Sequence, residues 1–272
     1  MNLIRQFCDD FEVIIPSKCH SAGTLMCLGA NTIVMTKQAT LGPIDPSLNS
    51  PLNPQNPQVP NNPVARVPVS VESIKGYFEF AKKDLNISSE SELKDIYTNI
   101  SNQVHPLVLG DVYRSRTQIQ MLAEKLLSKQ IEDKDKIKNI ISFLCSDSGS
   151  HDYTIYRREV KNELGLNIEK PDDSFYDTIK KTFDDLKKEL ELNTAFDPNI
   201  MLGNQQTINY TCRRVLIESI EIGTHVYVSE GTLIKNVQNI SQMPPLPPIQ
   251  RTLIDDQRKF EGWRFEENKN NP

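Results

Sequence analysis

Several features that would indicate a particular function are scarce in this sequence. Its five cysteines are scattered and form no CxxC pair, so neither a zinc site nor a disulfide framework is predicted. Reduced thiols fit a cytoplasmic protein, and no metal ion is expected. Basic residues number 31 against 36 acidic ones, with a net charge of -5, so nucleic acid is not an expected partner.

Long apolar runs are also missing. No stretch approaches the roughly 18 apolar residues that a membrane span needs. The N-terminal MNLIRQFCDDFEVIIP lacks the cationic start and the cleavage site of a signal peptide. We therefore expect no membrane span in this chain.

The chain has 272 residues, enough for a substantial hydrophobic core. We predict a core over residues 1–168, which contains a Pro-rich insertion at 46–68 with seven prolines. A C-terminal helix and a small β segment are predicted over 169–242, followed by a flexible tail over 243–272.

A strand, a helix and a second strand are predicted near the N-terminus, over 11–15, 21–30 and 32–35. At this spacing they form a parallel β-α-β unit, which predicts an α/β fold with a parallel sheet flanked by helices. A third extended piece is expected over 40–46. Further helices are predicted over 70–85, 90–100, 111–127, 134–145, 157–165 and 173–193, and short strands over 214–219, 225–228 and 233–234, with a turn at 230–232.

Ser21 stands where the first helix begins, directly after the first strand. One interpretation is an ordinary N-cap, whose hydroxyl accepts a backbone N–H bond and contributes about 1 kcal/mol. The other is a nucleophile at the positive end of the helix dipole, where backbone N–H groups stabilise a developing oxyanion. Local sequence alone favours the cap, because helix starts are common and nucleophiles are rare.

A longer comparison favours the nucleophile. The segment SAGTLMCLGANTIVMTKQATLGPIDPSL over 21–48 resembles the nucleophile region of the serine dehydrogenase proteinase family, distant relatives of the Clp protease proteolytic subunit with the Clp/crotonase fold. The strongest match is LGPIDP over 41–46. Segments at 105–115, 121–127, 151–166 and 217–219 also look like those of the family.

The resemblance implies a serine peptidase that cleaves peptide bonds through an acyl-enzyme, without a cofactor or a metal. Ser21 matches the nucleophile, Asp45 the orienting acid and His151 the general base, with His105 as the alternative base. Ala22 would contribute to the oxyanion hole. A peptide or protein substrate and a homo-oligomer are implied, and relatives include membrane-associated forms.

The sequence departs from the family pattern at its start. Family members carry an earlier strand and a Thr-Pro-Gly-Gly type loop that supplies oxyanion-hole N–H groups, and no Gly-Gly pair occurs here. We therefore expect an N-terminally incomplete fold. A truncated gene product, a non-catalytic Clp-fold assembly or binding module, and a crotonase-like acyl-CoA enzyme are the alternatives.

Overall fold

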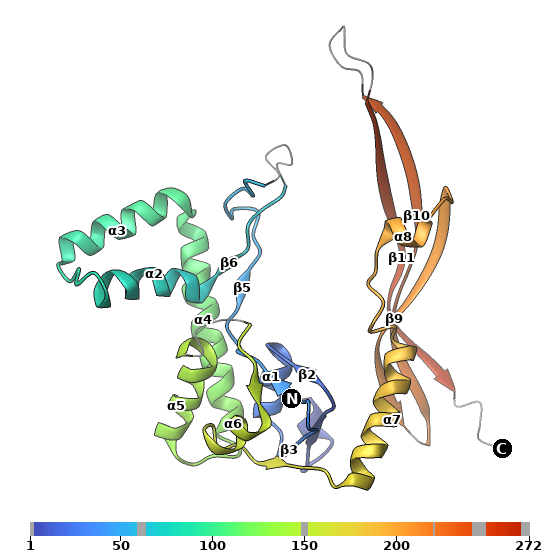
Figure 1. The fold of residues 1–272 in the computed structure, drawn as a ribbon, viewed down its shortest axis with the longest axis horizontal. Coiled ribbons are helices and arrows are strands. Elements are labelled where there is room, and N and C mark those ends of the chain that lie inside the picture. Colours follow the sequence, from blue (N-terminus) through green and yellow to red (C-terminus); the bar gives the residue numbers. More distant parts are fainter. Residues whose placement is uncertain (1–2, 59–63, 148–151, 220, 241–248, 268–272) are drawn as a thin grey trace. The chain divides into compact units, whose positions relative to one another are not determined.

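The computed structural model describes residues 3–58, 64–147, 152–219, 221–240 and 249–267 (Figure 1). The chain divides into two compact units, Met1–Tyr176 and Asp177–Pro272. This boundary lies eight residues after the end of the predicted core at 168. Each unit is described separately below.

The first unit contains the predicted β-α-β motif. After a short 3-10 turn, η1 (Ile4–Gln6), strand β1 (Glu12–Ile15) leads through α1 (Ala22–Leu28) to β3 (Thr32–Met35). β1 and β3 pair in parallel, and β3 also pairs in parallel with β8 (Ile168–Glu169). The unit is therefore a mixed α/β fold with a parallel sheet.

A second small sheet lies beside the start of α1. β4 (Thr40–Leu41) is its central strand, parallel to β2 (Lys18–Cys19) and antiparallel to β7 (Ile155–Tyr156). Cys19, Leu41 and Ile155 occupy one row across the three strands. The C-terminal ends of β2 and β4 and the N-terminal end of β7 therefore lie at the same end of this sheet.

The helices of this unit form around a main core and a smaller one. α4 (Pro106–Leu127) contributes Ala123 and Leu127 to the main core and Val108 and Val112 to the smaller one. α5 (Lys134–Ser142), a π-helical turn, η2 (Phe143–Asp147), and α6 (Arg157–Asn162) complete the main core. Helices were predicted over 111–127, 134–145 and 157–165, and α4 begins five residues before its predicted start, at Pro106.

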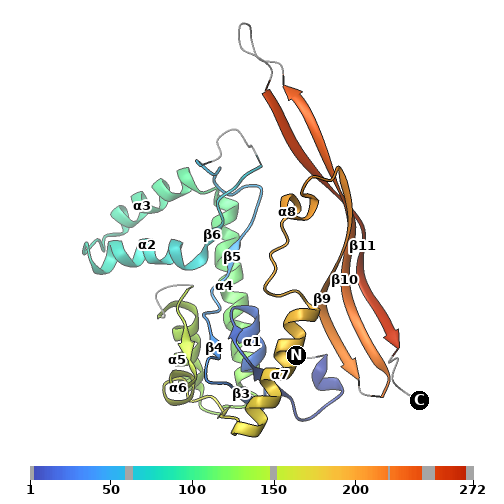
Figure 2. The same cartoon turned by 45° about the vertical axis from the view of Figure 1, so that its right-hand side comes forward.

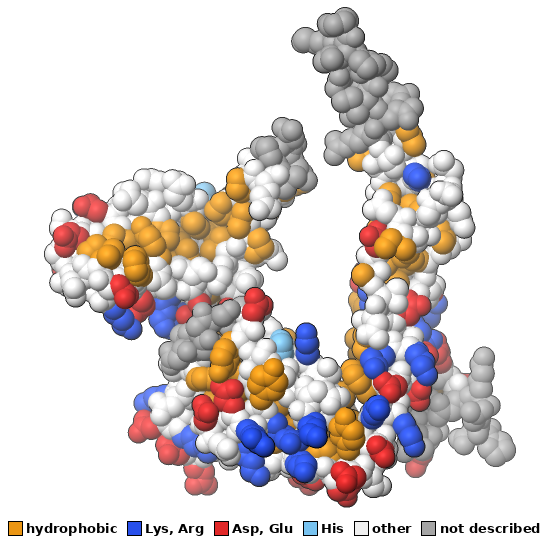
Figure 3. Space-filling view, in the orientation of Figure 1, with side chains coloured by type: hydrophobic (Ala, Val, Ile, Leu, Met, Phe, Trp, Pro, Cys, Tyr) orange, Lys and Arg blue, Asp and Glu red, His pale blue; other side chains and the backbone are white. Residues whose placement is uncertain are grey.

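A strand pair joins the start of the Pro-rich segment at 46–68 to the residues that directly follow it. β5 (Ser47–Leu48) pairs with β6 (Val69–Ser70), and the buried Asn53 side chain donates hydrogen bonds to the carbonyls of Leu48 and Val67, at 2.7 and 3.0 Å. β6 continues into α2 (Val71–Lys83), and α3 (Glu90–Gln103) follows. Figure 3 shows hydrophobic side chains gathered over these two helices.

The second unit is dominated by three long antiparallel strands, β9 (Thr207–Ser219), β10 (Gly223–Ile240) and β11 (Ile249–Glu267), with β10 in the centre (Figures 1 and 2). α7 (Asp173–Glu189), which starts just before the unit boundary, and the short α8 (Pro198–Leu202) precede them. The three short strands predicted from the sequence are parts of β9 and β10.

Two predictions in this region were wrong. The predicted tail at 243–272 contains the long strand β11, whose side chains contact β10 across the sheet. Nη1 and Nη2 of Arg264 each lie 2.5 Å from a carboxylate oxygen of Glu230, and Trp263 packs edge to face on Tyr227. The predicted turn at 230–232 lies inside β10, where a bulge between Glu230 and Gly231 shifts the register. A charged segment resembles a flexible tail when the strand that pairs with it is unknown. For the same reason, a glycine at a bulge resembles a turn.

Within the described ranges, no helix is both long and apolar enough to cross a membrane.

Candidate functional site

The backbone of Ser21 is strained. Its φ of 52° and ψ of -113° lie outside the regions that L-residues favour. Ser21 occupies the N-cap position of α1, yet its side chain makes no capping hydrogen bond, whereas Ser70 and Ser89 cap α2 and α3 by accepting from backbone N–H groups. The ordinary cap interpretation of Ser21 is therefore wrong. Strain of this kind costs about 1–3 kcal/mol and is concentrated at functional positions.

Two glycines make the tight turn around Ser21 sterically possible. A Cβ atom on Gly23 would lie 2.7 Å from the Sγ of Cys19, and one on Gly42 would lie 2.8 Å from the Cγ of His20. The residues on the N-terminal side of Ser21 therefore pack directly on these glycines. This gives a physical reason for the glycines in the SAG and LGPIDP segments.

The buried Thr24 hydroxyl joins α1 to the segment after β4. Its Oγ1 lies 2.8 Å from the carbonyl oxygen of Gly42 and 3.0 Å from that of Cys19, and accepts a hydrogen bond from the Gly42 amide at 3.2 Å. These bonds hold the start of α1 against the chain that leads from β4 to Asp45.

The amide of Ala22 lies at the N-terminal end of α1. Ala22 is the first residue of α1, so its N–H has no intrahelical acceptor. In the described part of the chain it makes no hydrogen bond, whereas the Gly23 N–H already donates to the His20 carbonyl at 3.0 Å. An N–H in this position can donate to an anionic ligand.

Asp45 is buried, with 5% of its surface exposed, and follows β4 on the segment that the Thr24 bonds hold. The preceding Ile44 N–H donates to the Leu144 carbonyl at 2.9 Å, which fixes this segment against η2. Burial raises the pKa of the neighbouring Cys145 thiol to about 12, and the negative charges of Glu72 and Asp45 add to this rise. Asp45 is thus buried beside η2, next to Ile44 of the main core.

The structure does not bring His105 to the Ser21 turn. His105 is the exposed N-cap of α4, and its Nδ1 accepts a hydrogen bond from the Leu107 N–H at 3.2 Å. Ala123, which packs in the same core as α1, lies 18 positions further along this helix, about 27 Å away at 1.5 Å per residue. This histidine serves as a helix cap.

His151 lies outside the described residues. β7 begins four positions after it, and β4 ends four positions before Asp45. Because Leu41 pairs with Ile155, the C-terminal end of β4 lies beside the N-terminal end of β7. The C-terminal end of β2, which is followed by Ser21, lies at the same end of this sheet.

Sequence reasoning missed two features close to Ser21. His20 turns toward β4, where its Nε2 lies 3.2 Å from the Oγ1 of Thr40. The Sγ atoms of Cys19 and Cys27 lie 3.7 Å apart. A spacing of eight residues matches no cysteine motif, and the two thiols meet only because α1 folds back over β2.

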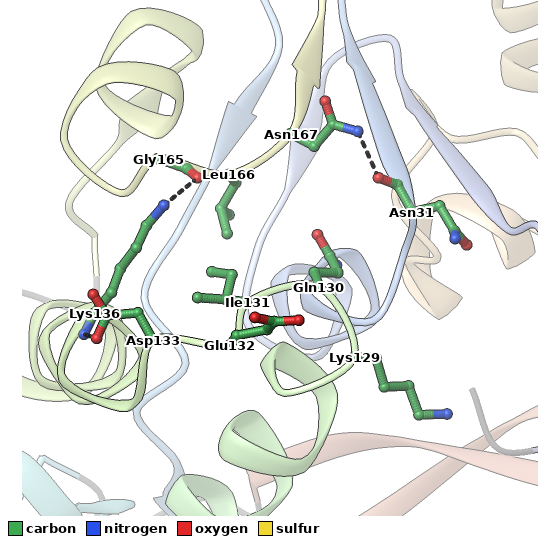
Figure 4. A pocket seen from close by; sticks show the side chains of 10 residues that line it. All are labelled: Asn31, Lys129, Gln130, Ile131, Glu132, Asp133, Lys136, Gly165, Leu166 and Asn167. Carbon is green, nitrogen blue, oxygen red and sulfur yellow. Dashed lines mark hydrogen bonds between the residues drawn. The ribbon is translucent and has the colours of Figure 1, made fainter.

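An open pocket of about 550 Å³ lies at the other end of the parallel sheet (Figure 4). Asn31 and Asn167, which precede β3 and β8, line it, and the Asn167 side chain donates to the Asn31 carbonyl at 2.7 Å. Lys136 donates to the Gly165 carbonyl on its other side. Since Ser21 follows the carboxyl ends of β1 and β2, this pocket is separate from the Ser21 turn.

Among the described residues no group of three His, Cys, Asp or Glu side chains could hold a metal ion.

Comparison with known proteins identifies no family. No family model matches the chain, and no solved structure matches it. The chain is similar to two uncharacterized proteins of Methanocaldococcus jannaschii, MJ0137 at 29% identity over 159 residues and MJ1495 at 27% over 157 residues. These alignments cover 58% and 57% of this chain but only 43% and 41% of the relatives, so the chain spans about two fifths of their length.

Proposed function

We propose that this chain is a serine hydrolase that cleaves peptide bonds through an acyl-enzyme on Ser21. The observation that carries the proposal is the backbone of Ser21, strained at a strand-to-helix turn while its hydroxyl is not used to cap the helix. A sharp, strained turn of this kind presents a nucleophilic serine in other hydrolases. The substrate class and a Clp/crotonase-like fold rest on the family resemblance of the 21–48 segment.

In the proposed reaction, the Ser21 Oγ attacks the acyl carbonyl and a tetrahedral intermediate forms. The Ala22 N–H donates to the oxyanion, at the positive end of α1. The small side chains of Ala22 and Gly23 leave the approach to this N–H open, since α1 starts without a bulky residue. The intermediate then collapses, the C–N bond breaks, and the amine leaves with the proton that the base took from Ser21. Water attacks the ester on Ser21, the carboxylic acid product leaves, and the Ser21 hydroxyl regains its proton.

A general base must take the Ser21 proton, and a carboxylate must orient that base. The resemblance assigns these roles to His151 and Asp45. The arrangement of β2, β4 and β7 supports the assignment, because the ends of these strands that lead to Ser21, Asp45 and His151 lie at the same end of the sheet. In sequence, each of the three residues is within four positions of its strand. The buried position of Asp45 also suits a carboxylate that orients an imidazole.

Labelling with a fluorophosphonate probe tests the proposal. The wild-type chain should be labelled on Ser21, and the Ser21→Ala variant should not be labelled. Ser17→Ala is the matched control, because Ser17 lies in the same connection four positions earlier and should leave labelling unchanged. Labelling of the Ser21→Ala variant at the wild-type rate would refute the nucleophile.

The same assay tests the other two roles. His151→Ala and Asp45→Asn should each slow labelling strongly, since the serine then loses its base or the orientation of that base. His105→Ala should label at the wild-type rate, because His105 caps α4 far along that helix from the main core.

A second candidate function is a non-catalytic assembly module. It is favoured by large hydrophobic side chains that α2 and α3 expose, with Phe80 at 53%, Tyr97 at 52% and Tyr77 at 47% exposed. Under this alternative the chain self-associates through these helices and Ser21→Ala changes nothing. Light scattering of wild-type protein and a Phe80→Ser/Tyr97→Ser variant tests self-association through these helices. The labelling assay at Ser21 then separates this alternative from the hydrolase.

A further inference from the structure

We propose that Cys19 and Cys27 form a modification site, a dithiol that peroxide oxidises to a reversible disulfide around the Ser21 turn. The two Sγ atoms lie 3.7 Å apart, and a disulfide requires about 2.05 Å, so the sulfurs must close by about 1.7 Å. All five cysteines of the chain are free thiols in this structure.

The two thiols differ in access. Cys19 is partly exposed at the end of β2, whereas Cys27 is fully buried in the last turn of α1. Their contact lowers the pKa of the Cys19 thiol, because Cys27 can donate its S–H to the Cys19 thiolate, while burial opposes this effect. The same contact, followed by burial, raises the pKa of Cys27. Cys19 is therefore the thiol that a peroxide meets first, and its lowered pKa increases the fraction of Cys19 that is present as the reactive thiolate.

The reaction balances with hydrogen peroxide as the oxidant. The Cys19 thiolate attacks one peroxide oxygen, the O–O bond breaks, and hydroxide leaves and takes up a proton to become water, which leaves a sulfenic acid on Cys19. The Cys27 sulfur then gives up its proton and attacks the Cys19 sulfur. The S–O bond breaks, a second water leaves, and the two sulfurs together have lost two electrons to the peroxide.

The disulfide would close a ring that contains the Ser21 turn. Gly23 lies directly against the Cys19 sulfur, so α1 and β2 have little free space between them. Closing the sulfur pair therefore shifts the start of α1 relative to β2 and moves Ser21. This consequence rests on the proposed function of Ser21, and a misplacement of about 1 Å in a reacting group costs on the order of 10²-fold in rate.

The test treats the full chain with hydrogen peroxide and maps alkylated peptides before and after reduction. After alkylation under denaturing conditions, peroxide-treated wild-type protein should have two fewer free thiols and yield a peptide with Cys19 linked to Cys27, and dithiothreitol should restore both thiols. Cys19→Ser and Cys27→Ala should give no such link. Cys8→Ser, which replaces another partly exposed cysteine, should leave the link intact. A sulfinic acid on Cys19 without the link, or no change at either residue, would overturn the proposal.

Fluorophosphonate labelling of the reduced and the oxidised protein measures separately how the disulfide affects the reactivity of Ser21. A roughly 10²-fold fall on oxidation, reversed by dithiothreitol and missing in Cys19→Ser, supports both the dithiol and its effect on Ser21. If the mapped link forms and neither state is labelled, the dithiol site stands and the proposed function fails. If labelling occurs and does not change while the link forms, the effect on Ser21 is refuted.

Discussion

The Thr24 hydroxyl lies 2.8 Å from the carbonyl oxygen of Gly42 and accepts a hydrogen bond from the Gly42 amide. This one side chain satisfies both backbone groups of a buried residue, between the start of α1 and the segment that carries Asp45. The Ser21 turn therefore keeps its place relative to Asp45 through Thr24, and four predictions follow from this arrangement and its surroundings.

Replacing Thr24 by valine should destabilise the first unit by about 2–3 kcal/mol, because the buried Gly42 amide and carbonyl lose their partner. Urea unfolding measures the change. Thr98→Val is the matched control, since Thr98 is exposed on α3 and only donates to the Lys94 carbonyl, so its replacement should cost less than about 0.5 kcal/mol. Equal costs at the two positions would contradict the role of Thr24.

A short series at Ser21 tests the strained, uncapped turn independently of catalysis. Ser21→Ala should change the free energy of unfolding by less than about 0.5 kcal/mol, because no capping bond is lost. Ser21→Gly should stabilise by about 1 kcal/mol, because glycine accepts a positive φ. Ser89→Ala is the control: Ser89 accepts from the Glu92 N–H and donates to its carboxylate, so its loss should cost about 1 kcal/mol. A loss of similar size in Ser21→Ala would restore the ordinary cap.

Gly42→Ala should cost about 1–3 kcal/mol, since its Cβ would lie 2.8 Å from the Cγ of His20. In a His20→Ala background the same change should cost at least about 1 kcal/mol less, and a double-mutant cycle measures this coupling. Gly110→Ala on the exposed side of α4, where a Cβ meets nothing within 4 Å, should instead stabilise by about 0.5–1 kcal/mol. An equal cost of Gly42→Ala in both backgrounds would show that His20 does not press on Gly42.

The stability of the fold should fall at alkaline pH through Cys145. Burial raises the pKa of this thiol from an ordinary value of 9.0 to about 12. The unfolded chain therefore releases the proton first, so a contribution that is complete below pH 9 is lost as the pH rises from 9 to about 12.

Comparison with Cys145→Ala isolates this contribution, because every other group titrates alike in both proteins. The difference in free energy of unfolding should shrink by up to about 1.4 kcal/mol per pH unit above the ordinary thiol pKa. Urea titrations from about pH 8 to about pH 10.5 cover the window. A difference that does not depend on pH would show that the folded thiol ionises as readily as the unfolded one.

Part of the fold follows from local patterns in the sequence. The apolar run at 11–15 and the small residues after Ser21 predicted β1 and α1, and apolar residues at helical spacing predicted α2 and α4, because each pattern depends only on neighbours along the chain. β11 was not predicted, since its charged residues resemble a tail until β10 supplies partners such as Glu230. The same limit explains the bulge at Gly231, whose glycine reads locally as a turn.

The sequence by itself determined that a serine stands between the first strand and the first helix, with glycines at 23 and 42 and a carboxylate at 45. Only the tertiary structure decided that Ser21 is strained and uncapped, that Thr24 fastens Gly42, and that Cys19 meets Cys27. The physical reason is that backbone strain and hydrogen-bond partners depend on which strands pair. The pairing of Leu41 with Ile155 joins residues far apart in the chain, and no local pattern encodes it.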